Sequence, residues 1–105
     1  MIVRVWRGET KLENAESYSR HVMTRVLPSL QRLRGHGGAY VLRRDAGGRA
    51  EFLVLTLWES LEAVREFAGE DVERAVVEPE ARAVLEEFDS IVRHYELLYD
   101  SVHPS

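Results

Sequence analysis

The stretch Glu51-Phe-Leu-Val-Leu-Thr-Leu-Trp-Glu59 decides the fold, because it predicts a β-strand that is apolar on both faces. Side chains alternate along a strand, so one face carries Leu53, Leu55 and Leu57. The other face carries Phe52, Val54, Thr56 and Trp58. A strand with water on one side would alternate apolar with polar residues, so this strand should be central and covered by two layers.

Length and composition favour one compact domain. The chain has 105 residues, 45% of them hydrophobic, and contains no cysteine, which excludes disulfides and thiolate chemistry. A formal charge of −4 argues against broad binding to nucleic acid or to anionic membranes. The N-terminus carries charges where a signal peptide needs an apolar core, and no apolar stretch could span a membrane, so we expect a cytoplasmic protein.

The segment before the central strand predicts a strand, a long helix and a second strand. Residues 2–7 alternate as a strand that Gly8 should end, and Asn14 suits the start of a helix. Pro28 lies inside this helix and should kink or restart it, because proline cannot donate to the residue four positions earlier. The apolar stripe of the helix consists of Tyr18, Val22, Val26, Leu30 and Leu33.

The rest of the chain adds a hairpin, two helices and a last strand. Residues 39–45 form a strand, and the turn 46–48 leads from it into the central strand. A short helix over 61–68 follows, and residues 91–98 predict the last strand. Pro79 should begin another helix, which is expected to carry Val84, Leu85 and Phe88.

This element order predicts an α+β fold, a ferredoxin-like plait in which a four-stranded antiparallel sheet carries its helices on one face. Residues 1–98 would form the domain and 99–105 a C-terminal tail. The open sheet face would expose the three leucines of the central strand together with Val3 and Val5. Because a soluble monomer rarely exposes so large an apolar patch, we expect a homodimer that pairs through this face.

The face toward the helices is the place for a small-molecule site. Arg4, Trp6, Thr56 and Trp58 should all point to it, and two indoles with a cation and a hydroxyl are typical of a pocket for a small aromatic ligand. Tryptophan on a buried strand also serves simply as core. Arg4 favours the pocket, since a charge rarely points into a core without a partner.

His94 is the candidate proton acceptor, because histidine exchanges protons near neutrality and Glu96 on the same strand face could orient it. It could equally be an ordinary strand histidine with a neighbouring partner. Arg44 near the hairpin tip could meet an acidic ligand, although a solvated hairpin end explains it as well. The four histidines lack the short spacings of zinc sites, so no metal is expected.

Three segments carry a family resemblance: Leu55-Thr-Leu-Trp-Glu-Ser60, the following Leu-Glu-Ala-Val-Arg-Glu-Phe-Ala-Gly-Glu-Asp over 61–71, and Arg93-His-Tyr-Glu96. Together with the element order, they resemble the antibiotic biosynthesis monooxygenase family of dimeric α/β-barrel proteins over residues 1–98. The resemblance implies a dimer whose two sheets form a barrel, with a pocket between sheet and helices in each subunit. It also implies that Trp58 lines that pocket.

The family includes oxygenases that convert phenolic polyketides to quinones without a cofactor, and haem-degrading enzymes. This chain departs from both. The haem-degrading branch has asparagine where this chain has Trp6 and a haem-ligating histidine where it has Val77, and the quinone-forming branch has asparagine where it has Val54. Neither known chemistry therefore transfers residue by residue.

Two functions fit these observations. The first is a cofactor-independent monooxygenase for an aromatic or polycyclic molecule, in which Arg4 or Arg44 stabilises an enolate or phenolate and His94 takes the proton. The second is a non-catalytic dimeric module of the same fold that binds a small ligand or a partner. An RNA-binding plait fits less well, because its central strand should display solvent-facing aromatic residues.

Overall fold

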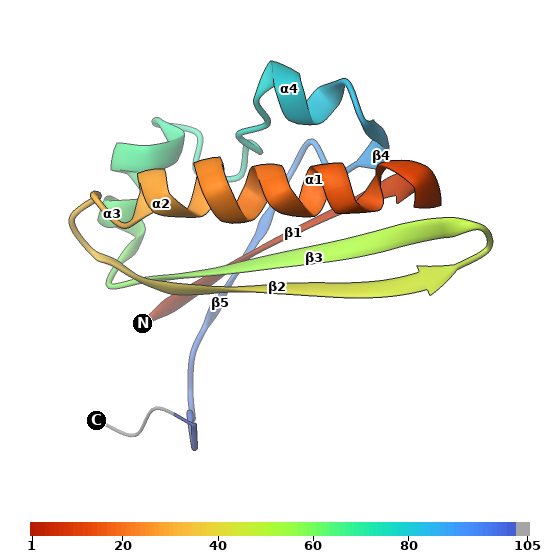
Figure 1. Ribbon diagram of the computed structural model, residues 1–105. Coiled ribbons are helices and arrows are strands. Elements are labelled where there is room, and N and C mark those ends of the chain that lie inside the picture. The colour runs from red at the N-terminus through yellow and green to blue at the C-terminus, as the bar shows by residue number, and fades with distance from the viewer. Residues whose placement is uncertain (103–105) are drawn as a thin grey trace.

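The computed structural model, which describes residues 1–102, is an antiparallel sheet of five strands with its helices on one side (Figure 1). The sheet order is β2-β3-β1-β4, and β5 also pairs with β1. This arrangement confirms the predicted α+β, ferredoxin-like fold. The strands are β1 (Ile2–Lys11), β2 (His36–Ala46), β3 (Arg49–Trp58), β4 (Leu85–Phe88) and β5 (Arg93–Glu96).

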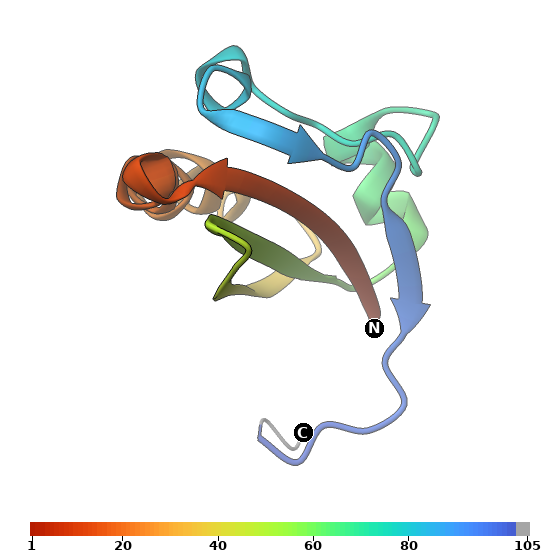
Figure 2. The same cartoon turned by 90° about the vertical axis from the view of Figure 1, so that its right-hand side faces the viewer.

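The helical segments all lie on one face of the sheet, and the chain after β5 runs away past the opposite face (Figures 1 and 2). Within the described part of the chain, none of the helices is long and apolar enough to cross a membrane. The helical segments are η1 (Leu12–Asn14, a 3-10 turn), α1 (Ala15–His21), η2 (Val22–Val26, a π-helical stretch), α2 (Leu27–Leu30), α3 (Leu61–Ala68) and α4 (Pro79–Arg82).

The first long helix changes its hydrogen-bonding pattern near Pro28, where a kink or a restart was expected. The proline lies in the first turn of α2, where its missing N–H costs nothing, and the preceding turn widens to the π-helical stretch η2. The backbone N–H of Leu27 accordingly donates to the carbonyl of Val22, five residues earlier. The helix continues across the sheet instead of breaking (Figure 1).

The central strand β3 lies between β1 and β2, which fixes the two faces of the sheet. Arg4 lies opposite Thr56, Trp6 lies opposite Val54, and these side chains share the helix-facing side. The hairpin between β2 and β3 turns at Gly47 and Gly48, whose φ angles of 61° and 77° are ones that glycine adopts without strain.

Three element predictions were wrong. Residues 85–88 form strand β4 rather than the end of a helix, because the helix that begins at Pro79 ends at Arg82 and β4 then pairs with β1. The last strand, expected over 91–98, covers only Arg93–Glu96 as β5. Strands β4 and β5 both pair with β1, along the edge that β3 does not occupy. Gly8 does not end β1 but lies within it, opposite Phe52 on one side and Phe88 on the other.

The core lies between the sheet and the helices in two clusters. One is built on Tyr18 and Phe52, whose ring centroids lie 4.8 Å apart. The other surrounds Trp58, which is 0% exposed, with Leu30 and Val64. Between the two clusters the packing is incomplete, and a cavity opens there.

Candidate functional site

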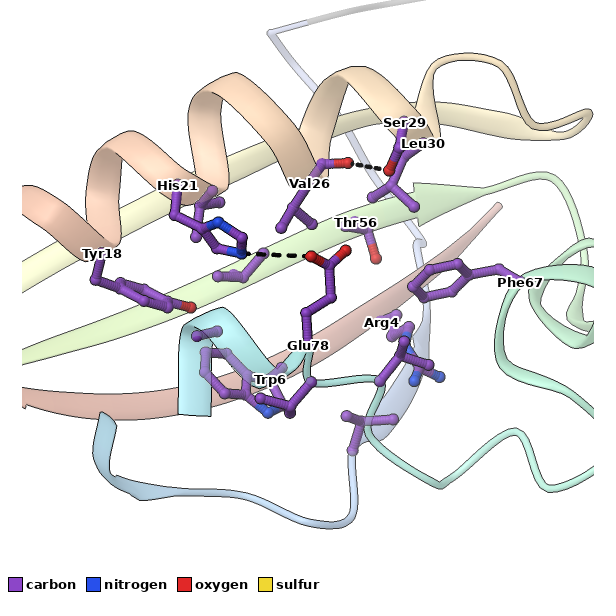
Figure 3. A pocket seen from close by; sticks show the side chains of 16 residues that line it. Arg4, Trp6, Tyr18, His21, Val26, Ser29, Leu30, Thr56, Phe67 and Glu78 are labelled. Carbon is purple, nitrogen blue, oxygen red and sulfur yellow. Dashed lines mark hydrogen bonds and ion pairs between the residues drawn. The ribbon is translucent and has the colours of Figure 1, made fainter. Parts of the chain in front are cut away.

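A cavity of about 100 Å³ lies between the helix-facing side of the sheet and the helical layer. Figure 3 shows Arg4, Trp6 and Thr56 on the strands, His21 and Val26 on the helix above them, and Phe67 at the side. The segment between α3 and α4 supplies the remaining side, including Val76, Val77 and Glu78. The lining is mostly apolar with a few polar groups, which is typical of small-molecule sites.

Arg4 is the charged residue of the cavity floor, and it is only 4% exposed. Its guanidinium donates to the carbonyl of Val72 at 2.5 Å and to the carbonyl of Arg74 at 2.8 Å, so it ties the segment after α3 to the sheet. It also donates to Nε2 of His94 at 3.0 Å. Its carbon Cζ lies 5.6 Å from the centre of the Phe67 ring. Every one of these partners is neutral.

The charge of Arg4 is therefore poorly compensated. Burial lowers its pKa to about 10. Among residues 1–102, Arg4 forms no ion pair with a carboxylate. Burial, and then the charge of Arg4, lower the pKa of His94 as well, so this histidine is held neutral as an acceptor. A buried cation without a carboxylate favours an anionic group or a developing negative charge nearby.

Trp6 lies along the cavity floor because Gly8 leaves room for its ring. A Cβ atom on Gly8 would lie 2.4 Å from Cη2 of Trp6, which is closer than any van der Waals contact. The indole N–H donates to the carbonyl of Asp89 at 2.9 Å, and Tyr18 lies beside the ring with centroids 6.2 Å apart. One indole face is thus held toward the cavity.

Trp58 lies on the same face of the sheet but does not line the cavity. It is completely buried, with Phe67 stacked on it at 5.4 Å between centroids. Its indole N–H donates to the hydroxyl of Thr56 at 2.9 Å, and Thr56 is a lining residue. Trp58 therefore supports the site from behind through Thr56.

The structure separates the two other predicted residues from the cavity. His94 lies opposite Arg4 in the β5–β1 pair and is not a lining residue, and its Nε2 already accepts from Arg4. Arg44 pairs with Glu51 at 2.9 Å on the open face of the sheet, with its side chain 72% exposed. The sheet lies between Arg44 and the cavity of its own chain, so Arg44 does not line this cavity.

His21 and Glu78 are lining residues that the sequence analysis did not identify. His21 follows Tyr18 by one helical turn and lies at the edge of the apolar stripe, which is the signal that could have drawn attention to it. Glu78 precedes Pro79 in a segment without periodicity, and no sequence pattern indicates its position. Among the described residues, no group of three or more histidine or carboxylate side chains is placed to hold a metal ion.

The fold is a two-layer α+β plait with a largely apolar cavity between sheet and helices, which places the chain in the class of small ferredoxin-like proteins with a site for a small molecule. The model of the antibiotic biosynthesis monooxygenase family matches residues 1–79. The chain belongs to this family.

Solved structures show the same fold at low sequence identity. MhuD from Mycobacterium tuberculosis, a haem degrader solved with two haems in its active site, is 19% identical with a TM-score of 0.67, over 95% of this chain and 98% of that chain. ActVA-Orf6 from Streptomyces coelicolor, a monooxygenase in complex with nanaomycin D, is 13% identical with a TM-score of 0.57, over 99% and 92%. A search of curated protein sequences found no match.

Proposed function

We propose that the protein is a monooxygenase that acts without a cofactor on a small aromatic molecule carrying an ionisable oxygen. One observation carries the proposal: Arg4 is a buried cation with only neutral partners, and it forms the floor of an apolar cavity. Such a cation would stabilise a phenolate or enolate, the electron-rich form of a substrate that reacts with molecular oxygen. In the overall reaction, the methylene group of such a substrate reacts with one molecule of oxygen. The products are a carbonyl group at the same carbon and one molecule of water.

The remaining lining residues suit an aromatic ring. Trp6 offers an indole face held by Gly8 and Asp89, and Thr56 supplies a hydroxyl whose orientation is set by Trp58. An aromatic ring on the indole would gain about 0.5 to 1.5 kcal/mol beyond its burial. A cavity of about 100 Å³ holds only part of a polycyclic molecule, so such a substrate would have to displace the half-exposed side chain of Glu78.

The experiment is a screen of hydroxyanthrones for oxygen consumption and for the absorbance of the quinone product. The matched variants are Arg4→Gln and Arg44→Gln, which remove the same charge from opposite faces of the sheet. We expect Arg4→Gln to lose about 10- to 100-fold in affinity for an ionised ligand, because a bond to a charged group is worth about 1.5 to 3 kcal/mol. Arg44→Gln should behave as the parent protein. Equal losses in both variants, or no turnover of any compound, would contradict the proposal.

A haem-based reaction is not supported by the lining residues. MhuD is a haem degrader, but the cavity here, at about 100 Å³, is smaller than the roughly 300 to 1,000 Å³ of ordinary ligand sites. At the position where the resemblance places an iron-binding histidine, the chain has Val77. The histidine that does line the cavity, His21, lies between two carboxylates. The lining therefore does not fit a haem.

A non-catalytic ligand-binding module is the second candidate. It is favoured by the three bonds that Arg4 already makes inside the protein, since these give the cation a structural role without any ligand. Binding of the same aromatic compounds without oxygen consumption would identify this function.

We also propose that the protein is a homodimer that pairs through the open sheet face. That face carries the half-buried residues Val3, Val5, Leu53, Leu55 and Leu57 and the exposed residues Tyr40, Leu42 and Tyr95. The test compares Leu42→Glu with Leu12→Glu, since both leucines are 46% exposed but Leu12 lies in η1, outside the sheet. Sedimentation should find a monomer only for the Leu42 variant, and an unchanged dimer in both would refute pairing through this face.

A further inference from the structure

His21 occupies an unusual position at the end of α1. Its side chain is 11% exposed and lines the cavity from the helical side, facing the strands that carry Arg4 and Thr56 (Figure 3). Its Nε2 atom is buried and has no hydrogen-bond partner in the described part of the chain. A buried polar atom without a partner is costly, and at the edge of a cavity it marks a place for a ligand atom.

Two carboxylates flank the His21 ring, one near each nitrogen. Oε2 of Glu78 lies 3.6 Å from Nε2, and Oε2 of Glu80 lies 3.5 Å from Nδ1. These distances allow ion pairing but exceed those of hydrogen bonds. A neutral imidazole has one N–H and can serve only one carboxylate, whereas an imidazolium has two and can serve both. Once the ring has taken a proton from a substrate, it therefore has an N–H for each of the two carboxylates.

We propose that His21 is the catalytic residue that removes a proton from the bound substrate. This inference rests on the proposed oxygenase function. The phenolic O–H or activated C–H bond of the substrate breaks, an N–H bond forms on Nε2, and the electron pair stays on the substrate as phenolate or enolate. The negative charge then faces Arg4 on the cavity floor, and the step itself consumes no oxidant or reductant.

Glu78 and Glu80 act as positioning residues in this scheme. In the scheme Glu80, 3.5 Å from Nδ1, is placed to accept from an Nδ1–H, which would leave the lone pair of Nε2 toward the cavity. Glu78 would be displaced when a substrate hydroxyl approaches Nε2. His94 cannot take the same part, because its Nε2 is occupied by the Arg4 guanidinium and it does not line the cavity. The sheet thus supplies the charge and the helix supplies the base.

The experiment follows the ionisation of a bound hydroxyanthrone by its absorbance and, separately, its oxidation. The parent protein should bind the probe as the enolate. His21→Gln should bind the neutral form and oxidise it about 10²- to 10⁴-fold more slowly, the usual contribution of a general base. His36→Gln is the matched control, because His36 lies against Trp58 outside the cavity lining, and it should keep both the enolate spectrum and the rate.

Rescue distinguishes chemistry from folding. His21→Ala leaves space at the cavity edge, so added imidazole should restore part of the lost rate, which a purely structural defect would not allow. Glu80→Gln provides a second variant with His21 intact, and it should weaken enolate formation without abolishing probe binding. A parent rate retained in His21→Gln would overturn the inference while leaving the oxygenase function in place. Failure of the parent protein to bind any probe would overturn both.

Discussion

Replacement of Arg4 by methionine measures how the buried cation contributes to the fold. The variant removes the donors to Val72 and Arg74 on the segment after α3, and the donor to His94 on β5. Bonds to a charged group are worth about 1.5 to 3 kcal/mol each, so the three together contribute about 5 to 9 kcal/mol. Opposing them is the cost of burying the charge.

The burial cost follows from the pKa of Arg4. Its lowering by burial to about 10 corresponds to about 3 kcal/mol against the charged form in the folded protein. Because methionine avoids this cost, the net loss expected for Arg4→Met is about 2 to 6 kcal/mol. The sign is the informative part, since buried charges replaced by apolar residues sometimes stabilise a protein.

The assay is urea unfolding followed by tryptophan fluorescence at one fixed protein concentration, because dimerisation would make stability depend on concentration. Arg44→Met is the control, since its pair with Glu51 is exposed and should be worth less than about 1 kcal/mol. An Arg4→Met protein as stable as the parent, or more stable, would refute the view that Arg4 holds the segment after α3 onto the sheet.

Three further predictions test the packing around the cavity. Gly8→Ala should destabilise the protein by about 1 to 3 kcal/mol in urea unfolding and abolish ligand binding, because its Cβ forces the Trp6 ring from its place. Trp58→Ala should cost about 3 to 5 kcal/mol, since the ring is fully buried, and a cost below 1 kcal/mol would contradict its core position. The pKa values of His36 and His94 are lowered by burial, and that of His94 also by Arg4, so the folded state resists protonation that the unfolded chain accepts. Stability should therefore fall as the pH drops below about 6.5, and the fall should be smaller in the glutamine variants of both residues.

Most of the fold could be predicted because its signals are local. The two-faced strand gave β3 its central place, the glycines at 47 and 48 gave the hairpin, and Ser60 caps α3 by accepting from the backbone of Ala63. Strand β4 could not be predicted, because Leu85–Phe88 has two glutamates at its centre and is held by pairing with distant β1. Pairing across such a separation leaves no periodicity in a four-residue segment.

The candidate site was only partly predictable for a related reason. The alternation of side chains along a strand predicts that Arg4, Trp6, Thr56 and Trp58 lie on one face of the sheet, and the structure agrees. Alternation does not predict how deeply each of these side chains is buried beneath the helices. Trp58 lies beneath Phe67 while Trp6 reaches the cavity, and that difference arises from Gly8 and from the packing of α3. The position of His21 against the segment after α3 depends on contacts that no sequence spacing encodes.

The arrangement of Arg4 links the two sides of the cavity. From β1, its guanidinium fixes the carbonyls of Val72 and Arg74, and a few residues later the same segment brings Glu78 to His21 on the helix. Arg4, which we propose as the electrostatic partner of the substrate, therefore also holds the segment between α3 and α4 that forms one side of the cavity. An anionic ligand that draws the guanidinium into the cavity would compete with these carbonyls, and the segment carrying Glu78 would loosen. If the proposed roles of Arg4 and His21 hold, the charge of the substrate and the access to His21 should be coupled through this one buried side chain.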